Sequence, residues 1–389
     1  MQENKNEYFL SQPHQPFFVL GIANAILMML LFALHYKGLI SFTVDGLSFH
    51  TYSLIFLVFS NAFVGFLFTT FPRFNQTQVI EKSFYVALFY TNTLGSLLFI
   101  LGAIFSEYLY FIAMLIIFLS GIFTLIKFQS IYNNGLAPDK SDSLWILTAS
   151  YFGVIGNALF LLSFFMPILL NVAINVAFYL YLIFLALSVG QRMIPFFSHS
   201  FAQKNPHFVT VVFVLFILKT VASASSFSIG EMVVDLILFA YITKEFLRWE
   251  LHPFQSPAIL WVLHLALAWL PLAFLLSAIS LGLELLLETA FYFLNFHLLA
   301  IGFLTTLLIG FGTRVTLGHS KQPPHGDALA TKIFLFIQLV VVARALFSIN
   351  IAFGWGLGFL FDLSFGLWIL LFLVWGGRYF KTLVYGTKI

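Results

Sequence analysis

Two histidines lie inside long apolar segments of the chain, where an imidazole finds little water. His50 opens the apolar segment 47–71, and His297 lies about nine residues into the segment 288–311. A neutral imidazole nitrogen is a good axial ligand for haem iron, and a haem held between two helices would give both side chains a partner. A neighbouring Ser, Thr or backbone carbonyl would satisfy each of them equally well. The positions of the two histidines therefore leave a haem site and a structural role open.

Four ionisable residues also fall inside apolar segments, where a charge is costly unless it is paired. Lys219 lies eight residues before an expected turn and Asp235 lies eight residues after it, so we predict that the two pair within a helical hairpin. Arg344 and Asp362 have the same relation, each nine residues from another expected turn. Either pair would hold its hairpin together. Arg344 has a second interpretation, as the anchor for an acidic ligand group such as a haem propionate.

The remaining histidines mostly fall in expected loops and tails. His264 lies about six residues into another apolar segment and is a reserve ligand for haem. A histidine in a loop is usually only solvated, but it can also bind copper or another metal. The candidate metal ligands of this kind are His199 and His319, together with His14, His207, His252 and His325.

The sequence excludes several kinds of site. It has no cysteine, which rules out disulfides, thiolate metal sites, iron–sulfur clusters and c-type haem attachment. It has no Walker loop, dinucleotide fingerprint, nucleophile elbow or His-Glu-x-x-His motif, and its carboxylates are too scattered to suggest an acid–base pair. No basic run is interleaved with aromatic residues, so we expect no nucleic-acid partner. No catalytic residue can be assigned.

The elements that must position these side chains are transmembrane helices. The chain is 61% hydrophobic and only 8% charged, whereas a soluble protein has about 25% charged residues. Apolar runs of about 20 residues, the length that spans a bilayer as a helix, recur with short breaks. We therefore predict an all-α polytopic membrane protein with about twelve transmembrane helices in a single transmembrane domain, 1–389. The expected spans are 16–36, 47–71, 84–105, 107–128, 143–166, 168–190, 208–227, 229–248, 258–280, 288–311, 333–352 and 355–376.

The basic residues predict the orientation of these spans. If the N-terminus is cytoplasmic, nearly all of the 18 Lys and Arg residues fall in inner loops and tails, and only Lys37 falls in an outer loop. Cytoplasmic loops of membrane proteins carry such an excess of Lys and Arg. We therefore expect 1–15 and 377–389 to be cytoplasmic tails, with the twelve helices over 16–376 in the lipid bilayer.

A weak internal repeat runs through the expected spans. Arg73, Arg192 and Arg314 follow the second, sixth and tenth spans and are separated by 119 and 122 residues. The spacing suggests three pseudo-symmetric four-helix units. The alternative is that any regular twelve-helix protein places Arg at the inner ends of its helices.

Several segments together resemble the NnrS family of bacterial membrane proteins. They cover most of the chain at the spacing expected for the family. They are Phe49-His50, GFLFTTFP at 65–72, GQRMIPFF at 190–197, WVLH and WLP within 261–271, and His297 with TRVTLGH at 313–319.

The resemblance implies haem b and copper in the bacterial inner membrane, and a role in nitric oxide response, denitrification or relief of nitrosative stress. One departure is visible. Tyr52 and Ser53 stand where the family often has a second His and a Glu, which puts a metal site using that second His in doubt. The implied partners are haem, nitric oxide or a related small molecule, and an electron donor of the respiratory chain.

The chain also resembles, more distantly, subunit I of the haem–copper oxidases, in which three four-helix units surround the cofactors. There, histidines in the second and tenth helices hold the low-spin haem. Asn295 stands two residues before His297, where the oxidases have a further His. The resemblance therefore implies one haem with two histidine ligands and no oxygen-reducing centre.

Three functions remain open on the sequence alone. The first is a haem protein that senses, scavenges or turns over nitric oxide. The second is a transporter or a copper- or haem-delivery protein without redox chemistry, and the third is a structural subunit of a respiratory complex.

Overall fold

The structure is a computed structural model that describes residues 8–252 and 255–389. Within these residues all regular structure is helical, which confirms the predicted fold class. Ten helical segments are long and apolar enough to span a membrane. The shorter apolar helix α10 (Phe208–Ala224) and its neighbour α11 (Ser228–Arg248) bring the described helical segments to the predicted number of about twelve. The chain is thus a multi-pass membrane protein in a lipid bilayer.

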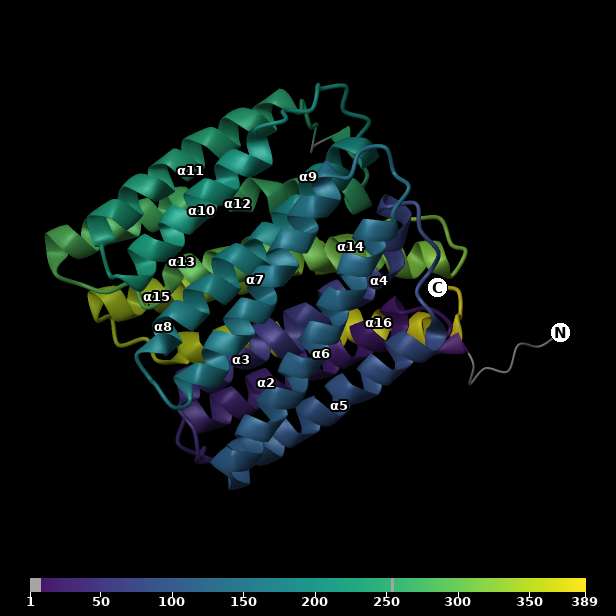
Figure 1. Cartoon of the computed structure of the whole chain (residues 1–389). Helices are drawn as coiled ribbons and strands as arrows, with labels where there is room; N and C mark the ends of the chain where they lie inside the picture. The colour runs from purple at the N-terminus through teal and green to yellow at the C-terminus, as the bar shows by residue number, and fades with distance from the viewer. Residues whose placement is uncertain (1–7, 253–254) are drawn as a thin grey trace. The chain divides into compact units, whose positions relative to one another are not determined.

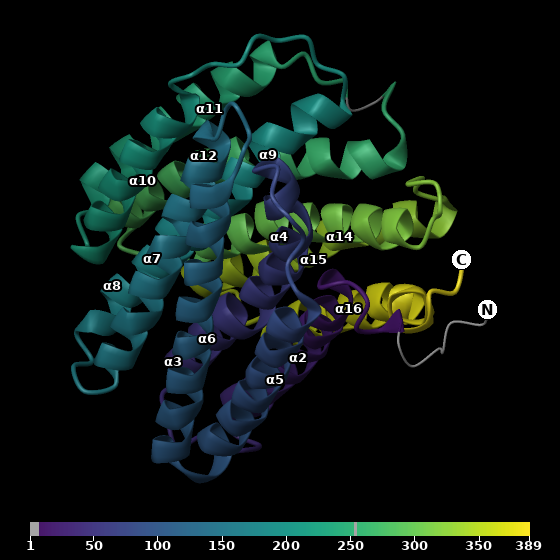
Figure 2. The ribbon, with the colours of Figure 1, turned by 45° about the vertical axis from the view of Figure 1, so that its right-hand side comes forward.

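The chain divides into two compact units. The first holds the described residues up to Leu182, with Val315–Pro323 and Phe372–Ile389. Its helices α5 and α6 run side by side in Figures 1 and 2. Ser106 separates them and accepts a hydrogen bond from the Leu109 amide at 3.4 Å, which caps α6. The elements of this unit are α2 (His14–Tyr36), α3 (Gly46–Tyr52), the π-helix η1 (Ser53–Phe59), α4 (Ser60–Phe74), α5 (Lys82–Phe105), α6 (Glu107–Asn134), α7 (Ser141–Ser163), α8 (Leu169–Asn175) and most of the π-helix η2 (Val176–Ile183).

The second unit holds Ile183–Arg314 and Pro324–Leu371. Asp327 caps the start of α15 by accepting a hydrogen bond from the Ala330 amide at 2.9 Å, and Gly354 ends the helix with a left-handed φ of 62°. Besides α10 and α11, its elements are α9 (Phe184–Phe197), α12 (Ala258–Leu287), α13 (Leu294–His297), the π-helix η4 (Leu298–Thr305), most of α14 (Thr306–His319), α15 (Ala328–Phe353) and the first half of α16 (Phe359–Tyr385).

The helices extend into the segments predicted as tails. α2 begins at His14 and α16 continues to Tyr385, so the helical structure is longer than the apolar runs at both ends. The division into two compact units describes packing, and folding as a single transmembrane domain stays a prediction.

Three of the membrane helices contain a π-helical segment. They are the second, sixth and tenth of the predicted spans, and their π segments begin at Ser53, Val176 and Leu298, at intervals of 123 and 122 residues. In the most apolar 18-residue stretch of these helices, 72, 89 and 72% is buried inside the protein. The share is at most 56% in the other candidate spans. π-helices are rare and often mark functional sites. Their regular placement supports the repeat that the spaced arginines suggested.

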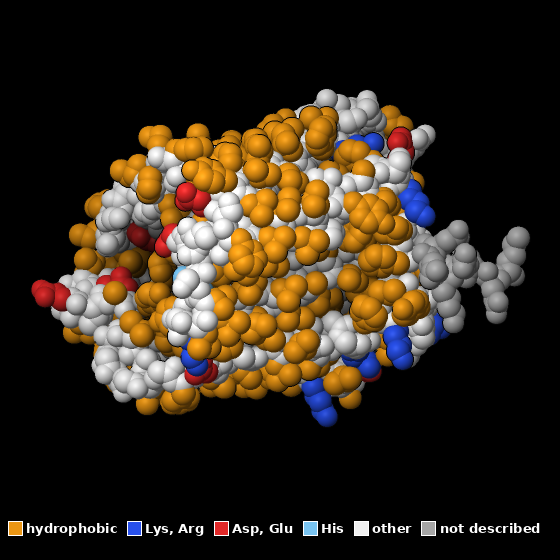
Figure 3. Space-filling model, turned by 90° about the horizontal axis from the view of Figure 1, so that it is seen from below, with side chains coloured by type: hydrophobic (Ala, Val, Ile, Leu, Met, Phe, Trp, Pro, Cys, Tyr) orange, Lys and Arg blue, Asp and Glu red, His pale blue; other side chains and the backbone are white. Residues whose placement is uncertain are grey.

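The surface drawn in Figure 3 is covered by a broad band of hydrophobic side chains, with Lys and Arg gathered at one end of the band. On α5, for example, Leu94, Leu97 and Leu101 follow one helical face and are 51, 55 and 44% exposed. Such a face is unfavourable in water and favourable in hydrocarbon, so it packs against lipid.

Candidate functional site

His50 lies in α3, near the start of the second span. The helix begins where the Asp45 carboxylate accepts a hydrogen bond from the Ser48 amide at 2.8 Å. The half-buried imidazole stacks on Phe32 of α2, with the ring centroids 4.2 Å apart. η1 begins three residues after it. The first unit therefore holds an imidazole against an aromatic wall, directly before a π-helical segment.

His297 ends α13 in the second unit and is followed at once by η4. Its Nδ1 lies 2.8 Å from the carbonyl oxygen of Phe293. Because a carbonyl only accepts hydrogen bonds, this contact requires the proton on Nδ1 and places the ring lone pair on Nε2. Metal-binding histidines are commonly oriented by a hydrogen bond of this kind. The geometry of His297 suits a ligand that binds through Nε2.

Arg344 of α15 is bonded to the segment that carries His297. Its guanidinium donates hydrogen bonds to Ser348 Oγ at 2.6 Å and to the Tyr292 carbonyl at 3.2 Å. Tyr292 and Phe293 are neighbours in the chain, so the structure brings Arg344 and His297 to adjacent carbonyls. Two predicted site residues are thus bonded to neighbouring residues of one segment. The predicted pairing of Arg344 with Asp362 stays a prediction.

The π segments after the two histidines share their local bonding. Ser60 Oγ donates a hydrogen bond to the Ile55 carbonyl and Thr305 Oγ1 to the Ala300 carbonyl, each at 2.7 Å and five residues back. The hydroxyls thus serve carbonyl groups that the wide π turn takes out of the regular α-helical ladder.

η4 is packed tightly against α12. A Cβ atom at Gly302 would lie 2.7 Å from the Trp269 ring, so only glycine leaves room for the indole. The Trp269 indole nitrogen donates a hydrogen bond to Gln338 Oε1 at 2.6 Å. A tryptophan from the WLP motif therefore fixes the span that begins at His297.

His264 has a structural partner. Its Nε2 lies 2.7 Å from Ser198 Oγ, and the ring is buried with no hydrogen bond at Nδ1. The neighbouring His199 is exposed and has a left-handed φ of 52°. The structure thus joins His264 to the loop after α9, while His199 points outward as a solvated side chain does.

His14 and His319 meet in the first unit. His14 begins α2, His319 ends α14, and their ring centroids are 4.5 Å apart. His14 is 1% exposed, and its Nδ1 has no hydrogen-bond partner. Two close imidazoles, one with an unsatisfied buried nitrogen, can serve as metal ligands.

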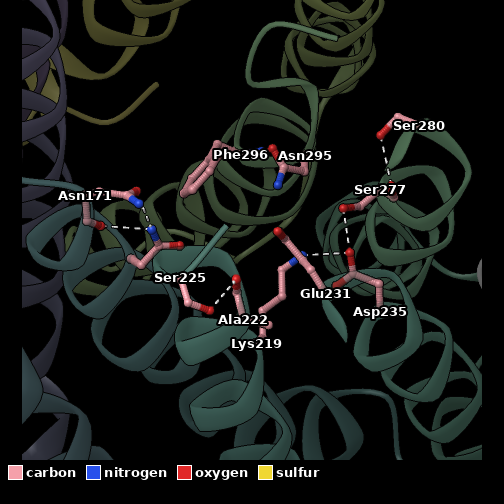
Figure 4. Close-up of polar contacts among 11 residues, drawn as sticks. Asn171, Lys219, Ala222, Ser225, Glu231, Asp235, Ser277, Ser280, Asn295 and Phe296 are labelled. Atoms are coloured by element: carbon pink, nitrogen blue, oxygen red, sulfur yellow. Dashed lines mark hydrogen bonds and ion pairs between the residues drawn. The ribbon is translucent and has the colours of Figure 1, made fainter. Parts of the chain in front are cut away.

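The predicted Lys219–Asp235 pair is confirmed and belongs to a larger cluster. Lys219 Nζ lies 2.7 Å from Asp235 Oδ2 and also 2.7 Å from Glu231 Oε1 (Figure 4). Ser277 Oγ donates a hydrogen bond to Asp235 Oδ2 at 2.6 Å. Lys219 and Asp235 are both 0% exposed, and Glu231 is 6% exposed. α10, α11 and α12 thus bury one ammonium between two carboxyl groups.

Comparison with known families shows the family of this chain. The model of the family described as NnrS protein matches residues 8–385. The chain belongs to the NnrS family. A search of curated proteins gives no match.

The residues of this NnrS-family chain can be tested against the cofactors that its sequence resemblance implies. For haem, His297 offers Nε2 with its ring oriented, and Arg344 lies beside it as a cation for an acidic group. For copper, His14 and His319 form the close imidazole pair. Within 8–252 and 255–389, no group of three or more His, Cys, Asp or Glu is placed to hold a metal ion.

Two residues of these clusters were missed by reasoning from the sequence. Glu231 lies four residues before Asp235, which places both on one face of α11, and that spacing was an available signal. Ser277 is one serine among many, and nothing in the sequence distinguishes it.

Proposed function

We propose that this NnrS-family protein binds haem b in the bacterial inner membrane and acts in the response to nitric oxide or the relief of nitrosative stress. We propose His297 as a residue that would hold the haem iron and Arg344 as the partner of a haem propionate, with His50 as a second candidate ligand in its own unit. We also propose that both chain ends lie in the cytoplasm. The sequence supports this orientation, because nearly all Lys and Arg residues then fall in inner loops and tails.

One observation carries the proposal: His297 is oriented by the Phe293 carbonyl at the start of a π-helical span. An imidazole inside an apolar helix that has its Nδ1 proton bonded is prepared for a ligand at Nε2. His50, which belongs to the first unit, supports the proposal because it also lies directly before a π segment. Arg344, bonded to the adjacent carbonyl, adds a positive charge suited to a carboxylate.

A bound haem would supply an iron centre able to bind nitric oxide or pass an electron. The protein residues would hold and orient it. The Phe293 carbonyl orients the imidazole of His297 through Nδ1, and Trp269 packs against the span at Gly302. Arg344 would neutralise an acidic group of the haem.

The test is the optical spectrum of the purified full-length protein and its variants. We expect Soret absorption in the wild type, a strong loss in His297→Ala, a loss in His50→Ala, and haem lost more easily from Arg344→Leu. His325→Ala, changed in a loop, is the control and should keep the wild-type spectrum. An unchanged spectrum of two histidine ligands in both His50→Ala and His297→Ala would overturn the assignment.

A second candidate function, copper handling without redox chemistry, is favoured by the pair His14 and His319. Its support is the buried Nδ1 of His14 that lacks a hydrogen-bond partner beside a second imidazole. Cu(I) is a suitable ion because it binds imidazole and accepts low coordination numbers. We propose this pair, rather than His199, as the copper site.

Copper titration of the purified protein separates this candidate from the first. His14→Ala and His319→Ala should each abolish one bound copper and leave haem content unchanged, with His199→Ala as the matched control. Equal copper binding by all three variants would eliminate the site.

A further inference from the structure

The cluster around Lys219 has one negative charge too many for its surroundings. One ammonium faces two carboxyl groups, each at 2.7 Å, and the three side chains are at most 8% exposed. If both carboxyl groups were ionised, the cluster would carry a net charge of −1 among apolar helices. An unbalanced charge among apolar helices is unfavourable, and a buried carboxylate takes up a proton instead.

The hydrogen bonds of Asp235 show where the deficit lies. Its Oδ2 accepts from both Lys219 and Ser277, at 2.7 and 2.6 Å. Its Oδ1 is buried and has no hydrogen-bond partner. In this fully buried carboxylate, Oδ2 accepts two hydrogen bonds and Oδ1 accepts none, and the one ammonium that it contacts is shared with Glu231. The two carboxylates together therefore lack one positive charge, which a single monovalent cation would supply.

We propose that this cluster is a proton-binding site, in which Glu231 and Asp235 together hold one exchangeable proton beside the Lys219 ammonium. A proton fits because it converts one carboxylate into a carboxylic acid and leaves the cluster neutral. The site lies outside the residues assigned to haem and copper, and it does not depend on either. It gives the membrane domain a place to load and release a single proton.

The other ionisable groups on the helices packed around the cluster leave this charge count unchanged. Glu284 of α12 interacts electrostatically with Glu231, and its carboxylate accepts a hydrogen bond from the Phe291 amide at 2.7 Å. His297 and Arg344 are bonded to the carbonyls of Phe293 and Tyr292. The rest lie at other positions along their helices: Arg192, Lys244, Glu245, Arg248, His264 and Lys332.

Glu284 offers the proton a way to water. Asp235 is 0% exposed, Glu231 is 6% exposed, and Glu284 is half-buried near the end of α12. The three carboxyl groups thus form a series of increasing exposure, with Glu231 interacting with both of the others. We place Glu284 as the exchange group between the cluster and the surface.

Infrared spectroscopy of the full-length protein in lipid tests the proposal through the C=O stretch of protonated carboxyl groups. At neutral pH, Glu231→Gln and Asp235→Asn should each remove the signal of about one carboxylic acid from the wild-type spectrum, because a single carboxylate balances Lys219. Lys219→Met should add about one, because both acids then take protons. Glu284→Gln should keep the signal but slow its shift in D2O.

Glu245→Gln is the matched control, since Glu245 is also a buried acid of α11 but is bonded to Asn205, Arg248 and Trp249. Its spectrum should match that of the wild type. No loss of carboxylic acid signal in Glu231→Gln and Asp235→Asn, with both variants folded by circular dichroism, would overturn the proposal. So would a wild-type signal that exists only in sodium-free buffer, because the cluster would then bind a metal cation.

Discussion

The two units solve the problem of buried polar groups in different ways. In the first unit, Asn24 donates hydrogen bonds to the Leu57 carbonyl in η1 at 2.8 Å and to Ser96 Oγ at 3.0 Å. Asn61 also donates to the Leu57 carbonyl, and Asn92 donates to Asn61 Oδ1. In the second unit the corresponding burial is of charges, with Lys219 between Glu231 and Asp235.

The difference between the neutral amide network and the charged cluster indicates a different role for each. A neutral amide network ties α2, α4 and α5 around the π segment, and it holds them together without burying a charge. A charged cluster with an unequal count of acids and bases is stable only with a further cation. The first is therefore a structural device, and the second is suited to exchange.

The largest effect should come from Lys219→Met. It removes the cation that both carboxyl groups share, and we expect a loss of about 3–5 kcal/mol in the free energy of unfolding at neutral pH. The loss should shrink as the pH falls, because the acids are then protonated in both the folded and the unfolded state. Denaturant titration in mixed micelles at several pH values measures it. A loss that is independent of pH would mean that only packing was removed.

Asn92→Asp should turn the neutral network into a charged one. The new carboxyl group has no buried base beside it, so it must stay protonated or break its contact with Asn61, at a cost of about 2–4 kcal/mol at neutral pH. The same titration applies, with exposed Asn133→Asp as the control. A cost equal to that of the control would show that water reaches the network.

A smaller effect is expected from Asn24→Ala. The change removes two hydrogen bonds, but Asn61 still serves the Leu57 carbonyl, so we expect a loss of about 1 kcal/mol. A loss above about 3 kcal/mol would indicate that η1 itself unwinds, which the amide infrared band would report.

Asp235→Asn should have the smallest effect on stability. The amide has nearly the shape of the carboxylic acid and can still accept from Ser277, so we expect a change below about 1 kcal/mol. Comparing Asp235→Asn with Lys219→Met separates the contribution of the cluster's shape to stability from the contribution of its charge. A destabilisation as large as that of Lys219→Met would favour a fixed ion pair over a proton site.

Much of the fold could be predicted, because apolar runs long enough to cross a bilayer dictate helices. The Lys219–Asp235 contact was also predictable, since two positions equally far from a turn reach the same depth in a hairpin. The π segments were not, because a π turn differs from an α turn by one shifted hydrogen bond and uses the same apolar residues. The meeting of His14 with His319 was equally hidden, because it joins opposite ends of the chain.

The hydrogen bond from the Ser60 amide to the Ile55 carbonyl spans five residues in place of four. One residue removed from an ordinary α-helix turns everything beyond it by about 100°. A wide turn already contains one residue more than an α turn, so a deletion within Ser53–Phe59 tightens the turn and leaves the faces on either side in place. Single-residue deletions should therefore be tolerated better inside the π segments than elsewhere in the same spans.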